Sequence, residues 1–323
     1  MLLKQKLFCD IIIKTQKGDF IMKKLKILLV IIVAVAVVGF AAYGIYTQIG
    51  AVKFDEIIID GVPEKAEGTT RVMSFNVRCA NDGEQTITNR GKVAMEMLEA
   101  YAPDSFGVQE CTPRWKRMLK RALGDKYACV GKARDFFGLF TEYSSIYYLK
   151  DKYKLIDSGT FWLSETPDKP YTKSFDSKCC RIASWAVLEN KETGERYTHI
   201  NTHLDHVLDS TRDAQMEVLI KRVLEIAGEG NVVMTGDFNA YEDSSVYAVA
   251  CESFLDAKYI AKNTDEGPTF TKYDTKKPDG KGAIDFIFVS KGIEAETYKI
   301  IRNTVQGIYP SDHFPIVADI YLK

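Results

Sequence analysis

Twelve polar residues stand at or near the ends of short apolar runs that are typical of β-strands. Such ends are where α/β folds usually carry their binding and catalytic groups. Most of the twelve are carboxylates, amides or imidazoles, which can bind a metal ion or transfer a proton. They are Asn76, Glu110, Glu142, Arg181, His203, Asp205, His206, Asp237, Asn239, Asp285, Asp312 and His313.

Histidine is scarce in this chain, which has only four. A lone histidine is more often a packed or surface residue than a catalyst, and this interpretation is favoured for His199. For His206 the two interpretations are evenly balanced. His203 and His313 each stand near a carboxylate at the end of an apolar run, so we predict that these two act in catalysis.

The segment NVVMTGDFNA, residues 231–240, predicts a buried strand that ends in a pair of polar side chains. We expect Gly236 to allow a tight turn, after which Asp237 and Asn239 emerge on the same side. A carboxylate and a carboxamide so placed can share a water molecule, the first taking its proton and the second orienting it. An ordinary Asx-turn is the alternative.

The chemistry that suits these residue types is attack on a phosphate ester. The reaction places negative charge on the phosphoryl oxygens and on the leaving oxygen. Mg²⁺ neutralises such charge and prefers oxygen ligands, and Mn²⁺ is an alternative. Imidazolium groups can donate hydrogen bonds to the same oxygens, and a neighbouring carboxylate keeps them protonated near neutral pH.

The elements that must position these residues are short strands interrupted by a few helices. This mixture predicts an α/β fold in which two sheets pack face to face with helices outside, in one catalytic domain over residues 70–323. Helical periodicity appears at 89–101, 113–123 and 211–227. The expected strands are 71–77, 105–109, 145–149, 182–188, 197–202, 231–235, 284–289 and 316–321.

The N-terminal region predicts a single-pass membrane protein. Residues 27–46 contain no charge and follow three lysines, so they are long enough to span a bilayer with residues 1–26 in the cytoplasm. A cleaved signal peptide is the rival interpretation. Residues 47–69 would form a polar stalk, and the domain would act outside the cytoplasm in either case. Met22 followed by two lysines resembles a better start, so we hypothesise that residues 1–21 are not translated.

Charge counts mildly against tight binding of nucleic acid. The first 46 residues hold seven lysines and two aspartates, which leaves 36 basic and 42 acidic residues in the remainder. No basic block concentrates positive charge, as tight non-specific binding of nucleic acid usually requires.

The order of the polar segments resembles that of the endonuclease/exonuclease/phosphatase superfamily. The similarity runs from SFNVR at 74–78 to SDHFPIVADI at 311–320. GTFWLSETP at 159–167 and NTHLDH at 201–206 are most similar to an exported bacterial branch. The resemblance implies a four-layered α/β sandwich, with two central mixed β-sheets flanked by helices, and hydrolysis of phosphate esters.

The resemblance also implies roles for individual residues. Asn76 and Glu110 would hold the metal, and Asp237 would activate water. Asn239 would contact the phosphate, and Asp312 would support the metal or a histidine. Two histidine–carboxylate pairs, His313–Asp285 and His203–Glu142, would flank the phosphate. Substrate contacts are expected from Arg181, Asp205 and Arg78, although abasic-site endonucleases carry an aspartate at the position of Arg78.

Three functions remain open at this point. Hydrolysis of phosphodiesters, whether in nucleic acid or in a lipid head group, is the leading expectation. The alternatives are a phosphomonoesterase of the inositol-phosphate type and a catalytically silent binding module of the same fold. Specificity is expected to come from loops over the site, namely 80–89, 131–142, 170–180 and 264–282. The sequence implies no protein partner.

Overall fold

The computed structural model describes residues 22–39, 52–54, 56–136, 138, 141–274 and 282–323. The chain divides into two compact units, Met1–Val52 and Lys53–Lys323, which are considered separately.

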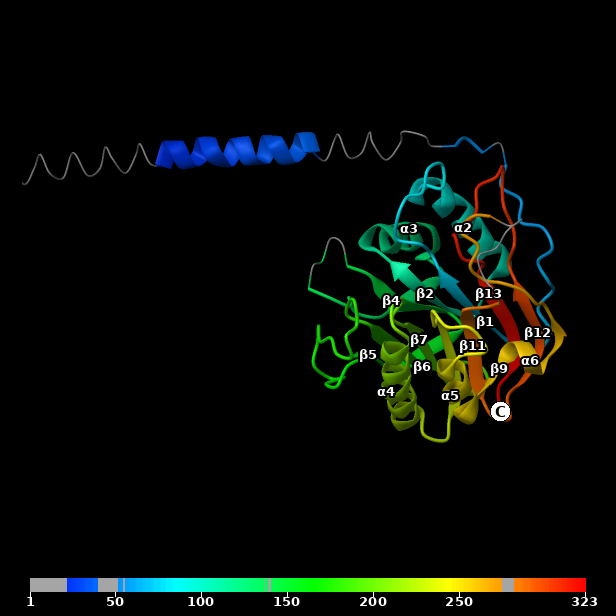
Figure 1. Cartoon of the computed structure of the whole chain (residues 1–323). Helices are drawn as coiled ribbons and strands as arrows, with labels where there is room; N and C mark the ends of the chain where they lie inside the picture. Colours follow the sequence, from blue (N-terminus) through cyan, green and yellow to red (C-terminus); the bar gives the residue numbers. More distant parts are fainter. Residues whose placement is uncertain (1–21, 40–51, 55, 137, 139–140, 275–281) are drawn as a thin grey trace, which may run out of the picture. The chain divides into compact units, whose positions relative to one another are not determined.

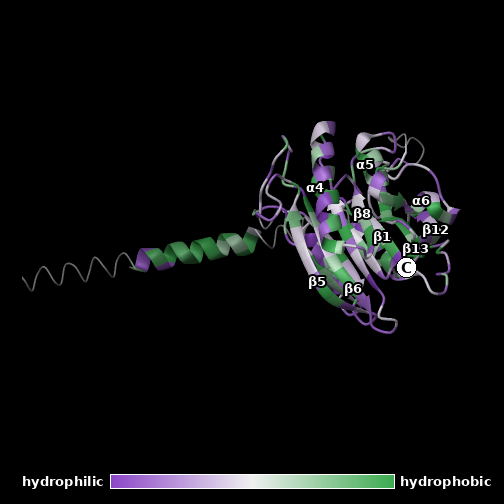
Figure 2. Cartoon of the chain, turned by 90° about the horizontal axis from the view of Figure 1, so that it is seen from below, coloured by the Kyte–Doolittle hydropathy of each residue, from purple (hydrophilic) through white to green (hydrophobic). Residues whose placement is uncertain are grey.

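In the first unit, residues 22–39 form an exposed α-helix that is hydrophobic after a hydrophilic first turn (Figure 2). Residues 1–21 and 40–46, which belong to the predicted cytoplasmic segment and membrane span, lie outside the described residues. Within the part of the chain that is described, no helix has both the length and the hydrophobicity needed to cross a membrane.

The second unit contains two mixed β-sheets, as the sequence predicted. The seven-stranded sheet has the order β10-β12-β13-β1-β2-β4-β3, and the six-stranded sheet has the order β5-β6-β7-β8-β11-β9. The strands are β1 (Thr70–Asn76), β2 (Ser105–Cys111), β3 (Tyr127–Val130), β4 (Tyr143–Leu149), β5 (Tyr153–Trp162), β6 (Ile182–Asn190), β7 (Arg196–His203), β8 (Asn231–Asp237), β9 (Phe254–Asp256), β10 (Ala261–Thr264), β11 (Asp285–Ser290), β12 (Glu294–Ile300) and β13 (Ile316–Tyr321). The helices are α2 (Ile87–Tyr101), α3 (Pro113–Leu123), α4 (Asp209–Ala227), α5 (Ser245–Ser253) and α6 (Ala257–Ile260).

Helices cover the outer face of each sheet, which confirms the predicted α/β sandwich (Figure 1). Strand β1 shows how the layers arise, because successive side chains of a strand point to opposite faces. Met73 and Phe75 pack outward with residues of α2 and α3, whereas Val72 packs inward between the sheets. A third apolar cluster lies between the six-stranded sheet and helices α4 and α5.

The described part of the predicted stalk packs on the domain. The described residues between 52 and 69 contain no helix or strand. Ile59 and Val62 nevertheless pack against the apolar cluster that includes α2 and α3, so this end of the stalk belongs to the folded domain.

A polar network crosses between the two sheets. Gln109 of β2 donates hydrogen bonds to Ser74 Oγ (3.1 Å) and to Asn201 Oδ1 (2.6 Å) on β7. His199 is buried and is hydrogen-bonded to Ser105 (2.8 Å) and Thr235 (3.0 Å), so it is a packed residue, as expected. Because buried polar groups gain from mutual satisfaction, the network fixes how the sheets are aligned.

Candidate active site

Strand ends from both sheets meet at the predicted site. Asn76 is the last residue of β1, and Asp237 is the last residue of β8. His203 at the end of β7 is paired with Asp237, and so is Asp285 at the start of β11. Strand β7 runs parallel to β8 and β11 runs antiparallel to it, so these three side chains emerge together.

Asn76 joins the carboxylates of the two sheets. Its side-chain amide donates hydrogen bonds to Asp237 Oδ2 (2.8 Å) and to Glu110 Oε1 (3.2 Å). Glu110 has a φ of 55° at a register shift of β2 against β4, and such an irregularity re-aims a side chain. Burial opposes ionisation of Glu110, but hydrogen bonds from Cys79 and Asn76 and the charge of His313 hold its pKa below the ordinary value. Glu110 is therefore a carboxylate at neutral pH.

His313 is held as a cation beside the reactive carboxylates. Its Nδ1 lies 2.8 Å from Asp285 Oδ2, and its Nε2 lies 3.7 Å from Asp237 Oδ2. Burial lowers the pKa of His313, but the carboxylates of Asp285 and Asp237 outweigh this effect and raise it to about 10. The structure thus brings His313 and Asp285 together, with the imidazolium facing Asp237.

The environments of Asp237 and His203 favour the uncharged forms of both side chains, in contrast to that of His313. Burial and the neighbouring Asp285 raise the pKa of Asp237 to about 7, although His313 opposes the rise. His203 Nε2 lies 3.4 Å from Asp237 Oδ2. Burial and the charges of Arg181 and Arg134 hold the pKa of His203 well below its ordinary value, so this ring is neutral. The expectation of two charged histidines is wrong for His203.

The turn after β8 differs from the predicted one. Gly236 lies within β8, and a Cβ there would be 2.8 Å from Thr202 O, so glycine is needed for close approach of β7. Asn239 adopts a φ of 50° and donates its N–H to Asp237 Oδ1 (2.9 Å), which makes an Asx-turn. Its amide Nδ2 donates to Leu204 O (3.1 Å). The turn therefore also orients the Asp237 carboxylate.

Two sets of side chains could hold a cation. Asp237, Asp285 and His313 place ligand atoms within 4.8 Å of one another. The carboxylates of Asp285 and Asp237 raise the pKa of His313, however, so its imidazole would have to lose a proton before it could bind a metal. Glu110 with Asn76 offers carboxylate and amide oxygens, the donors that Mg²⁺ and Mn²⁺ prefer, so these residues fit such an ion.

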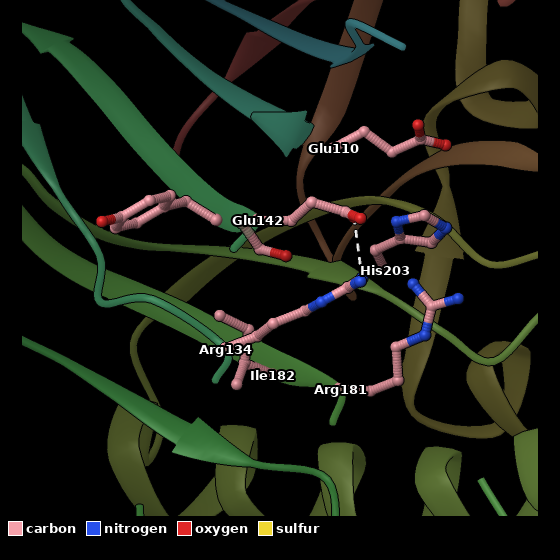
Figure 3. Close-up of a pocket in the computed structure, with 8 residues that line it drawn as sticks. Glu110, Arg134, Glu142, Arg181, Ile182 and His203 are labelled. Atoms are coloured by element: carbon pink, nitrogen blue, oxygen red, sulfur yellow. Dashed lines mark hydrogen bonds and ion pairs between the residues drawn. The ribbon is translucent and has the colours of Figure 1, made fainter. Parts of the chain in front are cut away.

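A small pocket opens beside Glu110 and His203 (Figure 3). Glu142 lies in this pocket but pairs with Arg134 Nη1 (2.7 Å). Within the described part of the chain no hydrogen bond or ion pair joins Glu142 to His203, which lies beside Asp237 instead, so the structure does not form the predicted His203–Glu142 pair. The reason is electrostatic: the Arg134 cation outcompetes a neutral imidazole for the carboxylate.

Asp205 was predicted to contact substrate, and its carboxylate is hydrogen-bonded within the protein. Its side chain is completely buried and accepts hydrogen bonds from the N–H groups of Lys178 (3.0 Å) and Val207 (2.8 Å) and from Ser177 Oγ (3.1 Å). Asp205 therefore ties the loop before β6 to the start of α4.

The remaining predicted residues lie next to these groups. Arg78 pairs with Asp82 (3.0 Å) and lies 3.4 Å from Asp312, which is buried below it. His206 Nδ1 lies 2.9 Å from Arg181 Nη2. Arg181 itself is 4% exposed and points into the pocket of Figure 3.

Arg134 is a site residue that the sequence did not single out. It lies in the predicted loop 131–142, where its N–H donates to Glu142 O (3.0 Å) and its carbonyl accepts from Trp162 Nε1 (2.8 Å). The sequence did offer one signal for Arg134, because it is a charged residue inside a loop that was expected to lie over the site.

Comparison with known proteins agrees with this geometry. The sequence model described as Endonuclease/Exonuclease/phosphatase family matches residues 73–313, which include both carboxylate sets and both site histidines. The chain belongs to this family. A family member of known structure from Bacteroides vulgatus, described as an endonuclease/exonuclease/phosphatase, is 31% identical with a TM-score of 0.73. The match covers 79% of this chain and 99% of that one.

Other similar family members have been given different activities. A mannosyl-6-phosphatase from Bacteroides thetaiotaomicron is 29% identical, with a TM-score of 0.72 and coverage of 78% and 99%. The exoribonuclease subunit Ccr4 of the CCR4-Not complex from Candida albicans is 25% identical over 263 residues, or 68% of this chain. The match spans only 30% of that relative's length, and 52% of a probable Ccr4 from Vairimorpha ceranae.

Proposed function

We propose that residues 70–323 form a divalent-metal-dependent hydrolase of phosphate esters. The observation that carries the proposal is the convergence of Asp237 with the His313–Asp285 pair on one side and the Asn76–Glu110 pair on the other. A silent binding module would not need a protonated imidazole and a carboxylate of near-neutral pKa at the same point.

The residues suggest a division of labour. Asp237, with a pKa of about 7, can take the proton of an attacking water near neutral pH. His313 can donate its Nε2 proton in a hydrogen bond to a phosphoryl oxygen, while Asp285 fixes the ring through Nδ1. Asn239 keeps one amide N–H beyond its bond to Leu204 and can contact the phosphate.

Glu110 and Asn76 would hold Mg²⁺, or Mn²⁺, which when bound neutralises charge on the phosphoryl and leaving oxygens. Family membership and the oxygen donors support this assignment. The mannosyl-6-phosphatase and exoribonuclease relatives support phosphate esters as the substrate class.

A direct assay tests the proposal. The purified chain would be incubated with Mg²⁺ against DNA, RNA, sphingomyelin, inositol phosphates, mannose 6-phosphate, p-nitrophenyl phosphate and bis(p-nitrophenyl) phosphate. We expect hydrolysis of at least one ester that stops when EDTA is added and returns with excess Mg²⁺. Failure to hydrolyse any of them, in a chain that remains folded, would favour a binding module.

We also propose that the domain acts outside the cytoplasm. The uncharged run at 27–46 after three lysines supports export, by an anchor or by a cleaved signal. Protease added to intact cells should then degrade the domain. Protection equal to that of a cytoplasmic control protein would contradict export.

A further inference from the structure

Two arginines in the site pocket have N–H groups without acceptors. Arg181 Nε, Arg181 Nη1 and Arg134 Nε are buried and lack a hydrogen-bond partner. They make up three of the seven buried side-chain polar atoms without partners in the described part of the chain. Both side chains line the same pocket (Figure 3).

An unsatisfied guanidinium is costly to bury. The described residues supply no hydrogen-bond acceptor for these N–H groups, so a ligand could do so. Glu142 cannot serve both arginines, because Arg134 Nη1 already binds it at 2.7 Å. His206 takes only Arg181 Nη2. Asp135 Oδ2 lies 3.6 Å from Arg134 Nε, and Glu110 also lines the pocket, so carboxylates balance the two arginines. The N–H groups of Arg181 remain without an acceptor.

The pocket is small. The space inside it that a water-sized probe can occupy is about 10 Å³, with Tyr143, Ser144 and Ile182 completing the wall. Pockets that enclose a whole small molecule usually measure about 300–1,000 Å³. The enclosed space therefore has room for about one oxygen atom next to the proposed point of attack, and not for a complete substrate.

We propose that Arg134 and Arg181 make the enzyme selective for phosphate monoesters by binding a terminal oxygen of the phosphoryl group. A monoester has about two negative charges near pH 7 and three oxygens that accept strongly. A diester has one charge, and its second ester oxygen carries a substituent that must be placed beside the arginines. This inference rests on the proposed function and narrows it to one class of ester.

The first test measures binding and needs no turnover. Calorimetry with the Mg²⁺-loaded full chain would compare inorganic phosphate with dimethyl phosphate. We expect Arg134→Met to weaken phosphate binding about ten- to a hundredfold, the loss typical of a charge-assisted hydrogen bond, and to change the weaker dimethyl phosphate binding far less. Arg121→Met, on the exposed face of α3, is the matched control and should change neither. Equal effects on both ligands would overturn the proposal.

The second test measures selectivity in turnover. The wild-type chain should have a higher kcat/KM for p-nitrophenyl phosphate than for bis(p-nitrophenyl) phosphate, and Arg134→Met should lower this ratio at least tenfold. Arg134→Lys keeps the charge and loses the planar fork, so its ratio should lie between those of the wild type and Arg134→Met. This variant also serves if Arg134→Met does not fold. A wild-type preference for the diester, or an unchanged ratio, would refute monoester selectivity. If neither ester is hydrolysed, the binding test decides the role of the pocket by itself. The proposed function is refuted only if none of the wider set of esters is hydrolysed either.

Discussion

The side-chain amide of Asn76 lies 2.8 Å from the Asp237 carboxylate, although the two residues end strands of different sheets. The same amide reaches Glu110 on its own sheet. The candidate metal ligand and the candidate base are thus joined by one side chain. Their separation depends on how the two sheets are aligned, so residues far from the substrate should control activity through that alignment.

Gly107 provides a test of this dependence. A Cβ at Gly107 would lie 2.3 Å from both Asn201 Oδ1 and Thr235 Oγ1, two members of the network between the sheets. We expect Gly107→Ala to lower the free energy of unfolding by about 1–3 kcal/mol, as overpacking usually does, and to reduce kcat. Urea denaturation and steady-state kinetics would measure both. Gly282→Ala, where a Cβ would meet nothing within 4 Å, is the control.

The central strands and the main helices could be predicted from sequence because their apolar patterns are strong. All eight expected strands and all three expected helices are present. The strands that were not predicted include β3, β5, β9 and β10, which lie at sheet edges. Strand β5 has an irregular pattern of buried and exposed residues, so neither alternation nor a continuous apolar run marks it.

It was easier to predict from the sequence which residues belong to the site than which of them pair with one another. Asp237, Asp285 and His313 were predicted because they stand at the ends of apolar runs. The pairing of β11 with β8 places Asp285 beside Asp237, and His313 is hydrogen-bonded to Asp285. The partner of Glu142 depends on Arg134, whose position comes from loop bonds between distant segments. Asp205 carried the same local signal as the catalytic residues and is as buried as Asp237 and Asp285. Its hydrogen bonds from the N–H groups of Lys178 and Val207 distinguish it.

Replacement of the two central catalytic groups should stop turnover without unfolding the protein. We expect Asp237→Asn and His313→Ala each to lower kcat by at least about 10²–10⁴-fold, the usual contribution of a general acid–base group. Asp237→Asn should keep or raise the melting temperature, because the native carboxylate is buried at a cost that raises its pKa. Near-native turnover in either folded variant would remove that residue from the mechanism.

Activity should depend on pH in a bell-shaped manner. Asp237 must lose its proton, so kcat/KM should rise with pH up to about 7, or lower with a cation bound nearby, since positive charge lowers a carboxyl pKa. His313 must keep its proton, so kcat/KM should fall as pH approaches about 10. Asp285→Asn removes a carboxylate that raises the pKa of His313, so the alkaline limb should move to lower pH. An alkaline limb in the same place would show that another group controls it.

Loss of the Glu110 carboxylate should weaken metal binding. A cation that binds only the folded state raises stability by about 2.7 kcal/mol at one hundred times its Kd. Mg²⁺ should therefore raise the melting temperature of the wild-type chain, and Glu110→Gln should reduce this shift and increase the Mg²⁺ needed for half-maximal activity. Glu192→Gln, at an exposed turn, should behave as wild type. An unchanged Mg²⁺ requirement in Glu110→Gln would place the cation elsewhere.

Acid should destabilise the domain through His199, which lies between the sheets rather than in the site. Burial lowers its pKa from 6.5 to about 3, so between these values the unfolded chain binds a proton that the folded chain does not. The free energy of unfolding should then fall with decreasing pH by up to about 1.4 kcal/mol per pH unit from this group alone. His199→Gln, which can still bond Ser105 and Thr235, should show a smaller slope below pH 6.5 in urea denaturation series. Parallel curves for the two proteins would assign the acid sensitivity to other groups, because a neutral side chain at this position cannot titrate.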